Sequence, residues 1–237
     1  MKIILICILV LASVFGSQFL VGTILTLIFG EAGVSSPLGL MAYSLISYVL
    51  AMVLIMVVPV KMFKKADLKT DREELGLLNP PTLTDIGLMP VGFIAQLVLS
   101  MGLVAVFSVF PWFNADESQG IGLQLFINPS DRVIMFITLA IIAPIMEEVI
   151  FRGWMYGKIR EILSQKVSEA AGIIIATFTV SLVFAILHLQ LNVGVNVFAL
   201  SVILCGLREV TGTIHAGILT HMLKNAVAIF AILLFGF

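Results

Sequence analysis

The apolar residues of this chain gather in runs that are long enough to cross a lipid bilayer. A membrane-spanning helix needs about 20 mostly apolar residues, and runs of that order recur along the whole sequence. The composition agrees, since 60% of the residues are hydrophobic and only 11% are charged. Such a chain buries its surface in lipid, which excludes an ordinary soluble domain. The sequence therefore predicts an all-α, multi-pass transmembrane helical bundle.

We predict seven transmembrane helices within a single integral membrane domain over residues 1–237. The first is a retained helix rather than a cleaved signal peptide, because its apolar run continues to Phe29. The fourth is one long helix whose second half enters the membrane interface. The sixth is short enough to be tilted or partly re-entrant, and an eighth span near 190–212 stays open. The predicted spans are 3–29, 37–60, 84–110, 132–163, 171–190, 193–208 and 213–236.

Lysine and arginine residues are concentrated in alternate loops, which sets the expected orientation in the membrane. The loop 61–83 and the stretch 152–166 are rich in them, whereas the loops 30–36 and 111–132 hold almost none. With an odd number of spans, this asymmetry places the N-terminus in the cytoplasm and the C-terminus outside. The loop 67–85 mixes both signs of charge and is expected to be a solvated connector. The predicted outer loop carries the acidic residues Asp116, Glu117 and Asp131.

Polar residues that are expensive to bury recur in three of the apolar segments. The fourth span contains EEVIFR at 147–152, the fifth contains His188, and the last contains His221 and Asn225. Ionisable residues inside a membrane cost several kcal/mol, by order of magnitude, so they predict a functional site. At about 1.5 Å rise per residue, a hairpin of the fourth and fifth spans puts the carboxylates and His188 at about the same depth.

Helix geometry separates the two adjacent carboxylates. Residues four apart share a helix face, so Arg152 can hold Glu148, and Tyr156 lies on the same stripe. Glu147 points about 100° away and is free to meet another partner. This division suits a site with one ionised scaffold acid and one acid tuned as a base. The competing interpretations are a structural ion pair, histidines that only pack, and Asn225 as a bond between helices.

The three motifs resemble those of the CPBP family of intramembrane proteases. EExxxR at 147–152, FxxxH at 184–188 and HxxxN at 221–225 occur in the family's order, each in an apolar segment. This family includes the type II CAAX prenyl endopeptidases and bacterial relatives once called abortive-infection or bacteriocin-immunity proteins. The resemblance covers roughly residues 130–226, which we take as the catalytic core. Some relatives have eight spans, where we count seven.

The resemblance implies a peptide hydrolase with six functional residues. Glu147 and His188 would activate a water molecule, and His221 and Asn225 would stabilise the oxyanion, beside the Glu148–Arg152 pair. A zinc site of Glu147, His188 and His221 is the alternative, because a carboxylate and two imidazoles suit zinc. HExxH is absent, and we favour the metal-free reaction.

The expected partners are a membrane-associated peptide or protein substrate and the bilayer, with no nucleic acid. A compact chain of this kind suits the cytoplasmic membrane of a bacterium, where small leader-bearing precursors are the expected substrates. Two other classes stay open. One is a non-enzymatic scaffold or bacteriocin immunity protein with the same fold. The other is a small transporter in which buried Glu and His relay protons.

Overall fold

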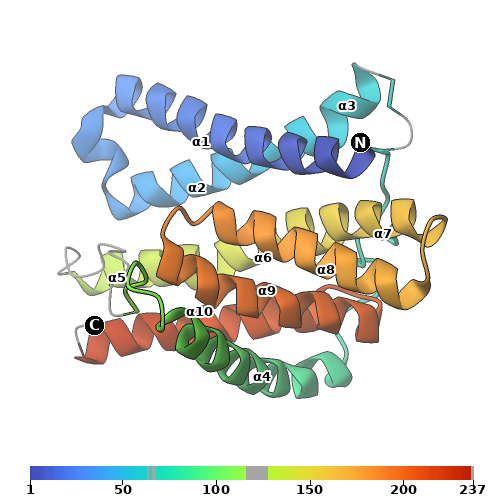
Figure 1. Ribbon diagram of the computed structural model, residues 1–237. Helices are drawn as coiled ribbons and strands as arrows, with labels where there is room; N and C mark the ends of the chain where they lie inside the picture. Colours follow the sequence, from blue (N-terminus) through green and yellow to red (C-terminus); the bar gives the residue numbers. More distant parts are fainter. Residues whose placement is uncertain (63, 66–67, 116–127, 236–237) are drawn as a thin grey trace.

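The computed structural model describes residues 1–62, 64–65, 68–115 and 128–235, and this part of the chain is all-helical (Figure 1). Seven of its continuous helical runs are long and apolar enough to cross a membrane. The chain is therefore a multi-pass membrane protein. The elements are α1 (Lys2–Val34), α2 (Pro37–Met52), η1 (Val53–Val57), α3 (Val58–Lys61), α4 (Leu83–Phe107), α5 (Pro129–Phe136), η4 (Ile137–Ile142), α6 (Ala143–Glu148), η5 (Val149–Tyr156), α7 (Gly157–Ser164), α8 (Glu169–Ile186), α9 (Leu191–Thr211) and α10 (His215–Phe235), where η marks a π-helical turn.

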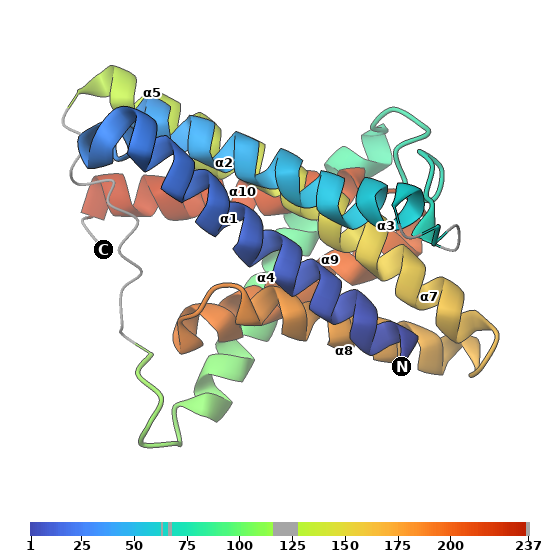
Figure 2. The same ribbon diagram turned by 90° about the horizontal axis from the view of Figure 1, so that it is seen from above.

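The elements from α5 to α7 form one continuous helix in the middle of the bundle. Figures 1 and 2 show the α1–α2 hairpin on one side of it and α4, α9 and α10 on the other. Both α2 and α10 contact α6. α6 ends in Glu147 and Glu148. The predicted motif therefore lies where the central helix contacts both α2 and α10.

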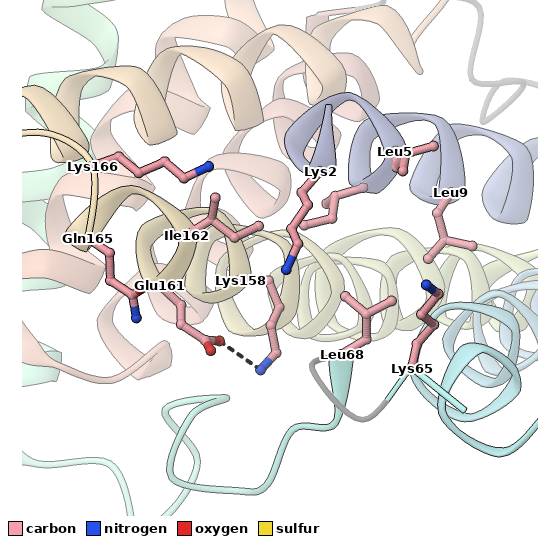
Figure 3. Close-up of a pocket in the computed structure, with 11 residues that line it drawn as sticks. Lys2, Leu5, Leu9, Lys65, Leu68, Lys158, Glu161, Ile162, Gln165 and Lys166 are labelled. Carbon is pink, nitrogen blue, oxygen red and sulfur yellow. Dashed lines mark hydrogen bonds and ion pairs between the residues drawn. The ribbon is translucent and has the colours of Figure 1, made fainter. Parts of the chain in front are cut away.

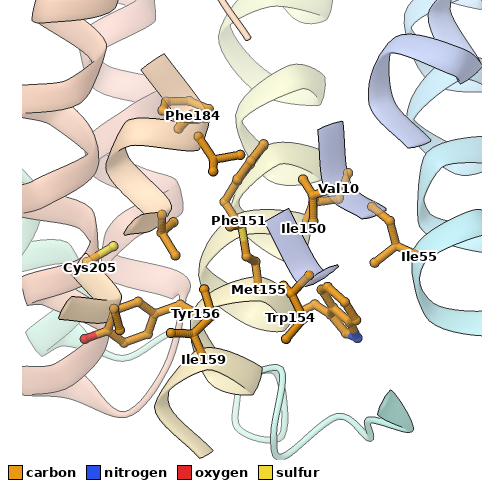
Figure 4. Close-up of a cluster of buried hydrophobic side chains, with 14 of the residues drawn as sticks. Val10, Ile55, Ile150, Phe151, Trp154, Met155, Tyr156, Ile159, Phe184 and Cys205 are labelled. Carbon is orange, nitrogen blue, oxygen red and sulfur yellow. The ribbon is translucent and has the colours of Figure 1, made fainter. Parts of the chain in front are cut away.

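The core is built around the second half of this central helix. Nearly all of η5 is buried, from Ile150 to Tyr156. Figure 4 shows these side chains packed between Val10 of α1, Ile55 beyond α2 and Phe184 of α8. The apolar side chains of this half are among the most buried in the described residues. Its entry into the membrane interface stays a prediction.

The predicted seven spans are confirmed, and the sixth shows where the sequence misled us. It is α9, a helix of 21 residues, so the expected short segment was wrong. Arg208 and Glu209 do not end the helix, because Arg160 donates to Glu209 at 2.6 Å and Arg208 donates to the Glu74 carbonyl at 2.9 Å. The helix ends at Gly212, whose φ of 70° is the left-handed conformation that glycine adopts at such ends.

The fifth span ends earlier than predicted. α8 stops at Ile186, and a tight turn that includes Leu189 (φ 55°) leads into α9. His188 therefore lies in this turn and not within the helix. In Figure 1 the turn ends short of the left-hand ends of α1, α2 and α10, so it stays within the depth that those helices span.

The loop after α3, predicted to be a solvated connector, is mostly exposed in its described part and is also anchored to the helices. Arg208 holds the Glu74 carbonyl, His215 Nε2 lies 2.6 Å from the Asn79 carbonyl oxygen, and Lys158 pairs with Glu74 at 3.3 Å. Residues 68–82 of the loop are thus tied to the ends of α7, α9 and α10. Glu117, in the loop predicted to lie outside, is not among the described residues. Cys7 and Cys205 are both free.

Candidate active site

Glu148 and Arg152 form the predicted pair at the junction of α6 and η5. Arg152 Nη1 donates to Glu148 Oε1 at 2.9 Å, and their side chains are 1% and 0% exposed. The π-helical turn begins directly after Glu148, and such turns are frequent at functional sites. Tyr156 was expected on the same stripe as the pair, but it does not join it. Its hydroxyl donates to Glu209 at 2.8 Å instead.

His221 of α10 lies between the two carboxylates. Its Nδ1 is 3.0 Å from Glu148 Oε1, and its Nε2 is 3.7 Å from Glu147 Oε2. A glycine one turn earlier allows this approach, since a Cβ on Gly217 would lie 3.3 Å from Glu148 Oε2. With a protonated imidazole, Glu147, Glu148, Arg152 and His221 together would be electrically neutral, which suits a low-dielectric interior.

Glu147 has a partner that sequence reasoning missed. The hydroxyl of Tyr48, on α2, donates to Glu147 Oε1 at 2.5 Å. Glu147 therefore meets different partners from Glu148, as the helix wheel predicted, and its side chain is 17% exposed where that of Glu148 is 0%. The one signal in the sequence was a tyrosine in an apolar span, because a buried hydroxyl usually finds a hydrogen-bond partner.

Phe184 contacts residues of all three motifs. The Arg152 guanidinium carbon lies 4.6 Å from the centre of its ring, a distance at which the ring attracts a cation. The ring centres of His188 and His221 lie 5.0 and 6.0 Å from it, and Phe151 packs at 4.9 Å. The FxxxH motif thus supplies the aromatic wall of the cluster as well as a histidine.

His188 reaches this cluster only through Phe184. Its Nδ1 lies 2.9 Å from the Phe184 carbonyl oxygen, so Nδ1–H is the donor, and in the neutral ring Nε2 has a lone pair. No hydrogen bond or ion pair joins His188 to Glu147 or Glu148 in the part of the chain described here. The structure therefore places His188 beside the cluster without joining it to the carboxylates.

Asn225 is engaged with the central helix. Its Nδ2 donates to the Leu139 carbonyl at 2.9 Å. In the π-helical pairing of η4, the donor to Leu139 would be the amide of residue 144, which is a proline and has none. Asn225 replaces that missing donor, so the bond between helices that was the competing interpretation of this residue is present. The carboxamide keeps one further N–H for another acceptor.

The zinc set considered above is not assembled by these residues. Glu147 and His221 are neighbours, but His188 does not join them, and within the described ranges no three His, Cys, Asp or Glu side chains are placed to hold a metal ion.

The cluster keeps unused hydrogen-bonding capacity. Glu148 Oε2, Arg152 Nε and Arg152 Nη2 are buried and have no hydrogen-bond partner among the described residues. Leaving such groups unpaired costs on the order of 1–3 kcal/mol each. They favour a site that binds a polar group over a core built for stability alone.

A separate basic pocket of about 400 Å³ lies at one end of the bundle, between α1 and α7 (Figure 3). Lys2, Lys65, Lys158 and Lys166 line it together with leucines of α1. None of the residues of the three motifs lines this pocket. It is a different feature from the carboxylate–histidine cluster.

Residues 129–227 match the family model of the Rce1-like type II CAAX prenyl endopeptidases. Over this segment, which is less than half of the chain, the protein is similar to that family. The segment runs from the first turn of α5 into α10, and it contains all six residues proposed from the sequence. Tyr48 lies outside it. Comparison of the chain with curated proteins and with solved structures gave no significant match. This similarity suggests a peptidase activity in the membrane.

Proposed function

We propose that this protein is an intramembrane endopeptidase in which Glu147 is the general base. The observation that carries the proposal is the arrangement around Glu147, which Tyr48 holds at 2.5 Å while His221 stands 3.7 Å from its other oxygen. Glu148 and Arg152 in turn orient His221. A base held by one neighbour and flanked by an oriented imidazole is what water activation requires.

In the proposed reaction, Glu147 takes a proton from a water molecule as that water attacks the peptide carbonyl. With Nδ1 bound to Glu148, Nε2 is the His221 nitrogen that can donate to the developing oxyanion, together with the second N–H of Asn225. Collapse of the tetrahedral intermediate breaks the C–N bond, and Glu147 returns the proton to the leaving amine. The free Nε2 of His188 would accept a hydrogen bond from the attacking water.

The proposed substrate is a peptide or protein segment within or against the membrane. In a bacterial cytoplasmic membrane with the N-terminus inside, small leader-bearing precursors fit best. A non-enzymatic scaffold or immunity protein is the second candidate. It is favoured by the engagement of Asn225 with Leu139 and by the absence of a bond between His188 and the described carboxylates.

Cleavage of candidate precursors by purified protein in lipid nanodiscs tests the proposal. We expect the wild type to cleave with or without a chelator, and Glu147→Gln to be inactive while still folded. Glu31→Gln, an exposed carboxylate on α1, is the matched control. Normal turnover by Glu147→Gln removes Glu147 as the base. Bound zinc that disappears in His221→Ala would make the enzyme a metalloprotease.

Asn225→Ala separates catalysis from packing. If Asn225 donates to the oxyanion, kcat should fall by about 10²–10³-fold, with little change in KM, because the bond strengthens only as charge develops. If the only role of Asn225 is its hydrogen bond to the Leu139 carbonyl, the variant should lose thermal stability and keep its kcat. Measuring kcat and the unfolding temperature of the same preparation decides between the two roles.

A further inference from the structure

A groove of about 480 Å³ lies between α4, α9 and α10, three helices that pack side by side in Figure 1. We call it the Lys224 groove, and its polar lining is Gln96, Ser100, Asn196 and Lys224. Two apolar residues of its lining, Leu97 and Met101, are 42% and 71% exposed on the outer surface. The groove therefore opens sideways, toward the space that lipid chains occupy.

Lys224 places a basic side chain at mid-depth in the bundle. It lies nine residues after the start of α10 and eleven before its end, or about 14 and 16 Å from the two ends. It makes no hydrogen bond and no ion pair within 4.0 Å with the described residues. The charge of Glu147 acts on it, but Glu147 is bound by Tyr48. An ammonium group at this depth is expensive unless an anion joins it.

Gln96 supplies a second unused group in the same groove. The residue is 3% exposed, and its Oε1 has no hydrogen-bond partner among the residues that the structure describes. The other two polar side chains are already engaged, since Ser100 donates to Asn196 and Asn196 donates to the Asn192 carbonyl. The groove therefore offers one cation and one amide, which match a carboxylate and a neighbouring peptide N–H.

The groove adjoins the candidate active site through α10. Lys224 follows His221 by three residues, which is about 4.5 Å along the helix axis on an adjacent face. A carboxylate bound by Lys224 would thus lie within a few residues of a peptide bond held at Glu147 and His221.

We propose that the Lys224 groove binds a carboxylate of the peptide substrate, with Lys224 as its ion-pair partner and Gln96 as an acceptor for a peptide N–H. This inference rests on the proposed endopeptidase function. The carboxylate is either an acidic side chain or the free C-terminus of the peptide. A substrate enters the groove from the side, through the bilayer.

The test compares labelled apolar peptides of Leu and Ala that differ in one group. One pair carries Glu or Gln in the middle, and the other ends in a free acid or an amide. Cleavage by the wild type in nanodiscs should favour the acid member of one pair by on the order of 10- to 100-fold in kcat/KM, mostly through KM. Which pair responds identifies the source of the carboxylate.

Lys224→Gln should abolish this preference, and Lys224→Arg should retain it. Lys166→Gln, an exposed lysine between α7 and α8, is the matched control. Peptide binding to Glu147→Gln protein, measured by fluorescence anisotropy, keeps the two proposals apart. Acid-selective binding through Lys224 without any cleavage by the wild type would overturn only the endopeptidase. Equal cleavage and binding of both members of each pair, or a preference that survives in Lys224→Gln, would overturn the groove assignment.

Discussion

At the residue scale, the site depends on how the positive charge of Arg152 is balanced by its neighbours. Its guanidinium bonds Glu148 and faces the ring of Phe184, and it is buried with them. A buried ion pair of this kind gives little net stability, but losing one member leaves a bare charge in a low-dielectric interior. Arg152 is therefore the position where a single substitution should cost most.

Arg152→Ala should destabilise the protein by about 3–5 kcal/mol, because it leaves Glu148 charged and unpaired. Arg152→Lys should restore part of the loss, since it keeps the charge without the guanidinium fork. Thermal unfolding in detergent measures both, with the exposed Lys166→Ala as control. An Arg152→Ala protein as stable as the wild type would contradict the pairing described here.

Tyr48→Phe removes one hydroxyl and leaves the ring in place. Hydrogen bonds to charged groups contribute about 1.5–3 kcal/mol, so a misplaced Glu147 should lower kcat/KM by roughly 10- to 100-fold. Tyr43→Phe on the same helix is the control, because Tyr43 forms no hydrogen bond with the described residues. Equal activity of the two variants would show that Tyr48 does not orient Glu147.

At the element scale, the site depends on how closely α10 approaches the central helix. Gly217 places the α10 backbone against Glu148, one turn before His221. Asn225 also donates to the Leu139 carbonyl, which receives no hydrogen bond from Pro144 because proline has no N–H. These contacts set the depth and rotation of α10, and with them the position of the His221 ring.

Gly217→Ala should disturb this approach. The new Cβ would stand 3.3 Å from Glu148 Oε2, and the carboxylate cannot yield because Arg152 and His221 hold its other oxygen. We expect a loss of about 1–3 kcal/mol, as for other overpacked sites. Gly206→Ala on α9 has nothing within 4 Å and should be neutral or slightly stabilising. The unfolding temperatures of the two variants give the comparison.

At the scale of the whole molecule, the bundle has one central helix with the α1–α2 hairpin on one side and α4, α9 and α10 on the other (Figures 1 and 2). The candidate active site lies where these two groups meet. Its orientation in the membrane stays a prediction from the lysine and arginine residues.

Cysteine labelling from either side of the membrane tests that orientation. In a variant with Cys7→Ala and Cys205→Ala, a cysteine at Lys69 should react only with a reagent on the cytoplasmic side. A cysteine at Ser35, in the exposed turn between α1 and α2, should react only from outside. Whole cells and inverted vesicles give the two measurements. The reverse pattern would mean that the charge asymmetry misled us.

The sequence by itself determined the seven spans and the Glu148–Arg152 pair. Both follow from local rules, because apolar length decides what can cross a membrane and residues four apart on a helix must be neighbours. The same rules also separated Glu147 from Glu148. They required no knowledge of how the helices pack.

Only the tertiary structure decided which groups meet across helices. Tyr48 and Glu147 are 99 residues apart in sequence, and nothing local to either one encodes their contact. The same is true of Lys224 and Gln96, whose shared groove exists only because α4 packs against α10. Helix periodicity fixes which face of a segment is polar. The partner of that face depends on packing geometry summed over the whole bundle, which no single segment contains.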